Sequence, residues 1–244
     1  MCVLAVEFID IHSHILPGVD DGCEDMIRSL TILKEMQNTG VTDVFLTPHY
    51  CKRRGYVTPV DKVRDVYDQL CKAVQQENIS VNLHLGTEME YSQDGSRYIK
   101  EGRVNTLGDT KYLLVEFPPY VSPKTFFSWI REICSLGYVP VVAHIERYTK
   151  VTKDKLCIES IRQLGALIQV NLRSVCSFNL RQRKFIKWLI CNRYVDFIAG
   201  DVHEFPIEEK EFQKCSRLVV RCSDEEYLRK IMSENARKIL LRQG

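Results

Sequence analysis

The chain has 244 residues, of which 45% are hydrophobic and 27% charged, close to the averages of a folded globular protein, so disordered and fibrous classes are excluded. A formal net charge of only +2 lacks the concentrated basic footprint of a nucleic-acid-binding protein. The first seven residues have no basic leader and no later apolar run could span a bilayer, so we expect a cytoplasmic protein without membrane insertion.

Strands and helices are predicted to alternate along the whole chain. Short apolar runs rich in β-branched residues predict seven strands, at residues 7–12, 42–47, 80–86, 112–117, 139–144, 167–171 and 195–199. Helical spacing predicts helices at residues 24–39, 59–77, 123–136, 153–164 and 177–192, a shorter one at 92–101 and a closing one at 223–241.

This alternation favours a parallel sheet with right-handed crossovers. Seven units favour a closed or nearly closed barrel, and the glycine-rich fingerprint of a doubly wound dinucleotide-binding sheet is absent after the first strand. We therefore expect an α/β protein with a distorted (β/α)7 TIM-like barrel, in a single domain over residues 1–244.

Histidines and carboxylates recur where the predicted strands end, which is where barrel enzymes place their active sites. Five of the six histidines lie at such ends. The residues are His12 and His14 with Asp20 and Asp21 just beyond, His49, Glu88, Glu116, His144, and finally Asp201 with His203. One such residue alone is more often a capping or hydrogen-bonding group, but the set as a whole predicts a metal site.

Imidazole and carboxylate donors without thiolates favour manganese, iron or zinc. The candidate ligands exceed the needs of one ion, so two or three neighbouring ions are expected. Such a cluster suits phosphoester hydrolysis, because it activates water and neutralises phosphoryl oxygens. The predicted metal ligands are His12, His14, Asp21, His49, Glu88, Glu116, His144, Asp201 and His203.

A phosphate group also calls for a guanidinium. Arg147, three residues after His144, is the leading candidate, whereas Arg53, Arg54 and Arg173 are better explained as solvated arginines. Asn171 is predicted to support ligands without binding metal. His84 lies inside the third strand and is excluded as a ligand.

The ten cysteines contain no Cys-x-x-Cys pair, and most are expected to be reduced core residues. Cys215 and Arg221 match the Cys-x5-Arg spacing of thiol-dependent tyrosine phosphatases, but the residues between them lack glycine. We treat this single match as unspecific.

Several motifs of the chain resemble those of the bacterial PHP-type (polymerase and histidinol phosphatase) protein-tyrosine phosphatases of capsule and exopolysaccharide loci. They occur in the family's order over nearly the whole chain. The motifs are residues 10–22 (DIHSHILPGVDDG), 47–49 (TPH), 86–88 (GTE), 114–117 (LVEF), 143–148 (AHIERY) and 200–203 (GDVH).

The resemblance implies a trinuclear centre, most often active with Mn²⁺, with iron, zinc, magnesium or cobalt as alternatives. It implies three ligand sets: His12, His14, Glu88 and Asp201; Glu88, Glu116 and His144; and Asp21, His49 and His203. Arg147 would contact the phosphoryl group, and Arg147, Asp201 and His203 would be catalytic. Some members have a second phosphate-contacting arginine soon after the last metal histidine, where this chain has none. Arg53 or Arg54, on the loop after His49, could compensate.

The resemblance further implies hydrolysis of protein phosphotyrosine by metal-activated hydroxide, with a tyrosine kinase that regulates polysaccharide export as the partner. Two alternatives stay open. The first is a PHP phosphoesterase acting on a small phosphomonoester such as histidinol phosphate, and the second is an inactive module that binds phosphotyrosine.

Overall fold

All seven predicted strands are present in the computed structural model, which describes residues 6–241. They are β1 (Phe8–Ser13), β2 (Val41–Leu46), β4 (Asn82–Leu85), β6 (Tyr112–Glu116), β7 (Val139–Val142), β8 (Leu167–Asn171) and β9 (Phe197–Ala199). Two further short strands, β3 (His49–Tyr50) and β5 (Glu88–Glu90), continue the paths of β2 and β4 after short breaks. The sequence does not predict these two, and they carry the ligand candidates His49 and Glu88.

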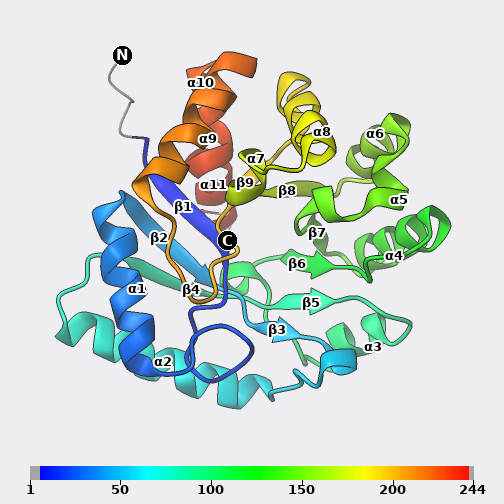
Figure 1. Cartoon of the computed structure of the whole chain (residues 1–244). Coiled ribbons are helices and arrows are strands. Elements are labelled where there is room, and N and C mark those ends of the chain that lie inside the picture. Colours follow the sequence, from blue (N-terminus) through cyan, green and yellow to red (C-terminus); the bar gives the residue numbers. More distant parts are fainter. Residues whose placement is uncertain (1–5, 242–244) are drawn as a thin grey trace.

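The strands form one curved parallel surface (Figure 1). Their order is β1-β2-β4 in one sheet and β3-β5-β6-β7-β8-β9 in the other, and the two sheets meet where β2 and β4 run on into β3 and β5. The ring closes at its carboxyl end, because the Asp201 N–H donates to His12 O (2.9 Å) and the His14 N–H donates to Val202 O (2.7 Å). The distorted barrel predicted from the sequence is thus confirmed.

Helices surround the curved sheet (Figure 1). The predicted helices appear as α1 (Met26–Asn38), α2 (Val60–Gln76), α3 (Gly95–Lys100), α4 (Pro123–Ser135), α6 (Lys155–Gln163) and α8 (Leu180–Cys191). The predicted closing helix consists of α10 (Glu225–Arg229), the π-helical η4 (Lys230–Glu234) and α11 (Asn235–Leu240). Short turns η1 (Lys52–Arg54), η2 (Leu107–Asp109), η3 (Ile145–Arg147), α5 (Thr149–Thr152) and α7 (Leu172–Val175) follow strands or connect helices.

One long helix, α9 (Glu209–Cys222), is absent from the sequence prediction. Its first half is highly charged, yet Phe212, Cys215 and Val219 are buried at the spacing of one helix face. This helix is the crossover that follows β9. Cys215 therefore faces the protein core and lies in no phosphate-binding loop.

Apolar side chains fill the inside of the barrel below the carboxyl ends of the strands. Alternate residues of each strand point inward, and they meet side chains of α11 at the end of the barrel opposite the carboxyl ends of the strands. The cluster includes Ile9, Ile11, Phe45, Leu114, Val141, Ala143, Phe197, Ala199, Ala236 and Ile239. Polar side chains occupy the other end, at the carboxyl ends of the strands. Within residues 6–241 no helix has the length and apolarity needed to span a membrane.

Candidate metal centre

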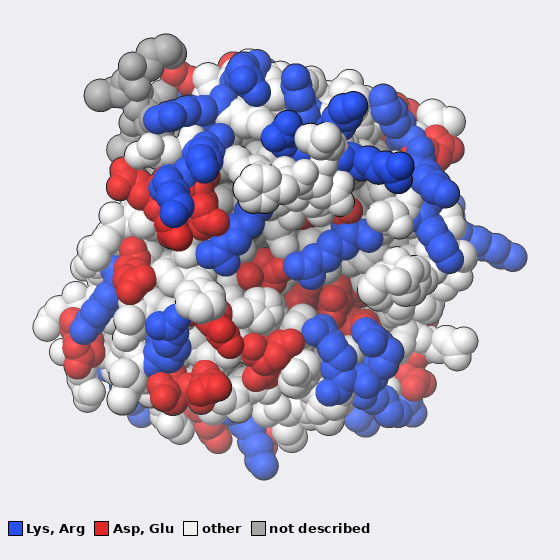
Figure 2. All heavy atoms as spheres, in the orientation of Figure 1, with Lys and Arg blue, Asp and Glu red and all other residues white. Residues whose placement is uncertain are grey.

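The nine predicted ligands meet at the carboxyl end of the barrel. They lie near the end of β1, at the first residues of β3 and β5, at the last residue of β6, and in the segments after β1, β7 and β9. Groups of donor atoms within 4.8 Å of one another are formed by His12, His14, Glu88 and Asp201, by His14, Asp21, His49 and His203, and by His49, Glu88 and Glu116. In Figure 2, acidic side chains occupy a hollow in the middle of this face, with Lys and Arg side chains around it.

Glu88 lies at the middle of the cluster. Its Oε2 is 3.1 Å from His12 Nε2, 3.2 Å from His14 Nε2 and 3.0 Å from His49 Nδ1. Despite this proximity, the oxygen is buried and has no partner in hydrogen-bonding geometry among the described residues. Three imidazole nitrogens therefore converge on one carboxylate oxygen without being aimed at it as donors.

The spacing of these atoms fits metal ligation. Ligand bonds of about 2.0–2.2 Å place neighbouring ligand atoms about 3.0–3.5 Å apart around an ion. His12 Nε2 and His14 Nε2 are 3.2 Å apart, and they lie 3.4 and 3.5 Å from Asp201 Oδ1. Two imidazole nitrogens and a carboxylate oxygen at these separations are the arrangement expected around one ion, so the residues fit a bound metal.

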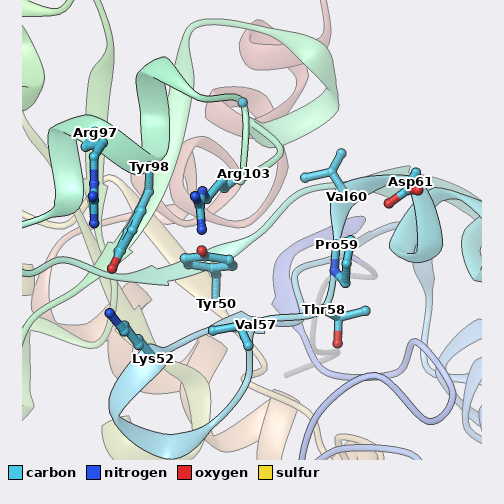
Figure 3. Close-up of a pocket in the computed structure, with 11 residues that line it drawn as sticks. Tyr50, Lys52, Val57, Thr58, Pro59, Val60, Asp61, Arg97, Tyr98 and Arg103 are labelled. Carbon is cyan, nitrogen blue, oxygen red and sulfur yellow. The ribbon is translucent and has the colours of Figure 1, made fainter.

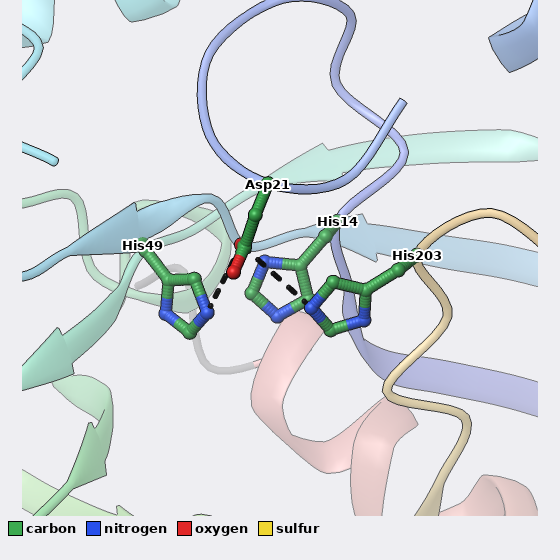
Figure 4. Close-up of side chains that lie close together, drawn as sticks. All are labelled: His14, Asp21, His49 and His203. Carbon is green, nitrogen blue, oxygen red and sulfur yellow. Dashed lines mark ion pairs between the residues drawn. The ribbon is translucent and has the colours of Figure 1, made fainter. Parts of the chain in front are cut away.

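A second group of donors lies nearer the solvent. Figure 4 shows the Asp21 carboxylate between the rings of His49 and His203, with His14 behind them. Asp21 Oδ1 is 3.4 Å from His49 Nε2 and 3.8 Å from His203 Nε2. The resemblance places His14 in another ligand set, whereas in the structure its ring also stacks on His203 at 4.1 Å between centroids.

The third predicted set surrounds the other oxygen of Glu88. His144 Nε2 is 2.7 Å from Glu88 Oε1 and 3.8 Å from Glu116 Oε2. Glu116 Oε1 is also 3.6 Å from His49 Nδ1. Glu88 thus faces donors from both sides through its two oxygens, the position of a carboxylate that bridges ions.

The charges of the cluster are crowded. Burial alone would raise the pKa of Glu88, but His12, His14 and His144 around it lower that pKa well below its ordinary value. Burial and the negative charge of Glu88 raise the pKa of Glu116 to about 8. Burial likewise lowers the pKa of His144. Burial also opposes protonation of His12 and His14, but the carboxylates around them raise the pKa values of these two imidazoles. A bound cation would displace their protons and favour ionisation of Glu116, as is usual where metal binding is coupled to proton release.

Asp20 orients two of the ligand candidates. Its Oδ2 lies 2.6 Å from His14 Nδ1 and accepts the backbone N–H of His49 at 2.8 Å. The loop carrying Asp20 can close only because Gly22 has no side chain, since a Cβ there would overlap the His14 backbone. Asp20 therefore fixes ring orientation, as carboxylates beside metal-binding histidines do.

Gln169 supports the centre from β8, and the sequence prediction missed it. Its Oε1 lies 3.3 Å from His12 Nδ1 and accepts the His144 N–H at 2.8 Å, while its Nε2 donates to Asn171 Oδ1. Asn171 Nδ2 donates in turn to Asp201 Oδ2 at 2.6 Å. A polar residue two positions before Asn171, inside an apolar strand, is the signal that points to Gln169.

Gln169→Ala is expected to lower metal affinity by about 10–100-fold, the usual effect of losing a residue that orients ligands. Titration of the chelator-treated protein with metal, followed by calorimetry, measures the change. Gln163→Ala, on the helix before β8, serves as the control. An affinity unchanged in Gln169→Ala would contradict this supporting role.

Two site residues have left-handed backbone conformations. φ is +34° at His144 and +50° at Asp201, a region that costs about 1–3 kcal/mol for residues other than glycine. Each residue lies two positions after the last residue of a strand, β7 or β9, and the turn directs its side chain into the mouth. Such strain concentrates at functional sites.

Two arginines touch the cluster. Arg147, 52% exposed, donates from Nη2 to Asp201 Oδ2 at 2.7 Å. Arg54, which the sequence suggested was a solvated arginine, instead lies 2.5 Å from Glu116 Oε1 and 3.0 Å from His49 Nδ1. That prediction is wrong, because η1 turns the Arg54 side chain over the centre. Arg53 points away and pairs with Glu90, and Arg173 pairs with Glu211.

The excluded residues lie elsewhere. His84 pairs with Asp43 at 2.9 Å in the first sheet, away from the cluster. Burial raises the pKa of the Cys215 thiol far above its ordinary value. A buried thiol with a raised pKa is not a nucleophile.

Comparison with known protein families gives a match over almost the whole chain. The family model described as capsular polysaccharide synthesis, CpsB/CapC, matches residues 8–241. The tyrosine-protein phosphatase CpsB of Streptococcus agalactiae is 29% identical over 239 residues, covering 95% of this chain and 98% of the relative.

Solved structures agree with this match. One of a pair described as the unique metal-dependent tyrosine phosphatases YwqE of Bacillus subtilis and CpsB of Streptococcus pneumoniae superposes with a TM-score of 0.85 at 27% identity, covering 97% of this chain and 95% of the other. The histidinol phosphate phosphatase of Lactococcus lactis gives a TM-score of 0.59 at 10% identity, with 88% and 94% covered. The second likeness is one of fold alone.

Proposed function

The chain belongs to the CpsB/CapC family of capsular polysaccharide synthesis, and from this premise we propose that it is a metal-dependent phosphatase acting on phosphotyrosine in proteins. The observation that carries the proposal is the convergence at one barrel mouth of eight imidazole and carboxylate side chains in overlapping groups, joined by His144 through its contact with Glu88. Relatives that match nearly the full chain are named tyrosine-protein phosphatases.

We further propose that the centre holds two or three ions, with Mn²⁺ as the physiological metal. The donors around Glu88 are imidazoles and carboxylates, and one further group brings Cys51 together with Glu90 and Glu116. Imidazole and carboxylate donors suit manganese, iron and zinc. When bound, the ions supply activation of water and neutralisation of the phosphoryl oxygens. Elemental analysis of the purified protein identifies and counts them.

The side chains around the centre divide the remaining work. Arg147 and Arg54 reach the cluster from η3 and η1, so a phosphoryl group held between them meets a guanidinium on two sides. Asp201 Oδ2 accepts hydrogen bonds from Arg147 and Asn171. Its other oxygen, Oδ1, faces His12 and His14. His203, only a third exposed, lies at the rim beside Asp21. We assign catalytic roles to Arg147, Asp201 and His203.

The protein substrate is proposed from the family. Because the family serves capsular polysaccharide synthesis, we propose as partner a bacterial tyrosine kinase of a polysaccharide export system. A phenolic leaving group, with a pKa of about 10, departs with less help from a general acid than an alkyl alcohol would need. This agrees with the mouth of the barrel, where most carboxyl groups are candidate metal ligands and few remain to act as a general acid.

A small phosphomonoester such as histidinol phosphate is the second candidate, because the same cluster of ligands suits any phosphate monoester. Comparing kcat/KM for a phosphotyrosyl peptide and for histidinol phosphate separates the two. A third candidate, an inactive module that binds phosphotyrosine, would bind the peptide and metal without turnover.

Chelation is expected to abolish phosphotyrosyl-peptide hydrolysis, and added Mn²⁺ is expected to restore it. Cys215→Ser is expected to keep at least half of the wild-type rate, because the thiol is buried on the inner face of α9 and burial raises its pKa. Phosphate release measured with and without chelator checks both statements. Activity that survives chelation but disappears in Cys215→Ser would refute a metal-dependent mechanism.

A further inference from the structure

A cavity of about 570 Å³ lies beside the metal centre, on the other side of strand β3. It is bounded by Tyr50 on β3, by Lys52 on η1, by residues around α3 and by residues 57–61 at the start of α2. A smaller cavity of about 270 Å³ adjoins it and shares Tyr50, Lys52 and Tyr98. None of the nine predicted metal ligands lines either cavity.

The lining of the cavity holds more basic than acidic side chains. It holds three cations, Lys52, Arg97 and Arg103, and one acid, Asp61. Figure 3 shows the nitrogen-bearing ends of the three cationic side chains gathered around the two tyrosines. Among residues 6–241, Lys52 Nζ has no carboxylate within ion-pairing distance. The cavity thus offers an anion at least one free ammonium group.

The two arginines are held above an aromatic floor. The Arg97 and Arg103 guanidinium carbons each lie 5.4 Å from the centroid of the Tyr98 ring, and Tyr50 packs edge-on against that ring. Their ion pairs with Asp94 and Glu101 are exposed, and exposed pairs are worth little. An incoming anion can therefore compete for both guanidinium groups.

The cavity and the metal centre share the segment formed by β3 and η1. Successive side chains of a strand point to opposite faces, so β3 presents His49 to the centre and Tyr50 to the cavity. In the same way η1 presents Arg54 to Glu116 and Lys52 to the cavity. An extended peptide advances about 3.3 Å per residue, so a side chain two to four positions from phosphotyrosine lies about 7–13 Å away, far enough to cross η1.

We propose that this cavity is a subsite for an acidic side chain of the substrate polypeptide, two to four residues from the phosphotyrosine. The inference rests on the proposed phosphatase function and adds a specificity determinant to it. The excess of basic side chains in the lining, the Lys52 ammonium left unpaired among the described residues, and the position of the cavity across η1 from Arg54 support this occupant.

The test compares two phosphotyrosyl peptides that differ only in carrying Glu or Gln at the flanking positions two to four residues away. The wild-type protein is expected to show a kcat/KM about tenfold higher for the Glu peptide. Lys52→Ala combined with Arg103→Ala is expected to reduce this preference below about twofold, while hydrolysis of the Gln peptide and of para-nitrophenyl phosphate stays within about twofold of wild type. Both residues are exposed, so their removal leaves the fold intact.

Lys62→Ala combined with Lys100→Ala removes the same charge from exposed positions of α2 and α3 outside the lining, and it should keep the tenfold preference. A preference that also falls in this control means general charge attraction and overturns the subsite. Equal wild-type rates on the two peptides overturn it as well, leaving the phosphatase function intact. If neither peptide is hydrolysed, the proposed function is refuted, and the subsite with it.

Discussion

Glu88→Gln is expected to lower kcat for phosphotyrosyl-peptide hydrolysis by about 1,000-fold, which corresponds to about 4 kcal/mol of transition-state stabilisation. The reason is the position of Glu88, whose two oxygens face His12, His14 and His49 on one side and His144 on the other. Gln keeps the size of the side chain but loses the charge that compensates the ions. Elemental analysis should find at least one ion fewer per chain than in wild type.

Asp43→Asn is the matched control for this substitution. Asp43 is also a carboxylate that pairs with a histidine, His84, but in the first sheet away from the mouth. The activity and metal content of the Asp43→Asn protein are expected to stay within about twofold of wild type. Circular dichroism should show that both variants are folded. A Glu88→Gln protein with full metal content and near-normal kcat would refute the central role of this carboxylate.

The sequence predicts that the candidate ligands lie together, because their meeting depends on topology. Parallel strands bring their carboxyl ends to one edge, so residues such as His12, Glu116 and His144 meet whatever the details of packing. The strand alternation is equally robust, since buried parallel strands leave continuous apolar runs. Both predictions need only the order of elements along the chain.

Features that depend on loop conformation or on side-chain direction could not be predicted. Arg54 and Arg53 are neighbours in sequence, and only the single turn of η1 directs one to Glu116 and the other to Glu90. The breaks that create β3 and β5 depend on close packing, such as the approach of Leu107 and Thr47 to Gly86. Helix α9 was missed because its charged first half obscures an apolar face that only tertiary packing reveals.

The second large effect is expected at the two arginines. Arg147→Ala is expected to lower kcat/KM by about 100-fold, since each charge-assisted hydrogen bond to a phosphoryl oxygen contributes about 1.5–3 kcal/mol. Arg54→Ala is expected to lower it by about tenfold, because Arg54, 30% exposed, reaches the cluster from the opposite wall through Glu116. The binding of inorganic phosphate, measured as a competitive inhibition constant, should weaken in parallel.

Arg53→Ala is the control that separates phosphate binding from general charge. Arg53 carries the same charge one residue away and is 60% exposed, but it points to Glu90, so its loss should change kcat/KM by less than about twofold. Lysine substitutions sharpen the comparison, because an ammonium keeps the charge but loses two-point contact with oxygens. If Arg54→Lys recovers full phosphate binding, Arg54 supplies charge alone. If Arg54→Ala binds phosphate as well as wild type does, Arg147 is the phosphate-binding arginine and the contact of Arg54 with Glu116 is structural.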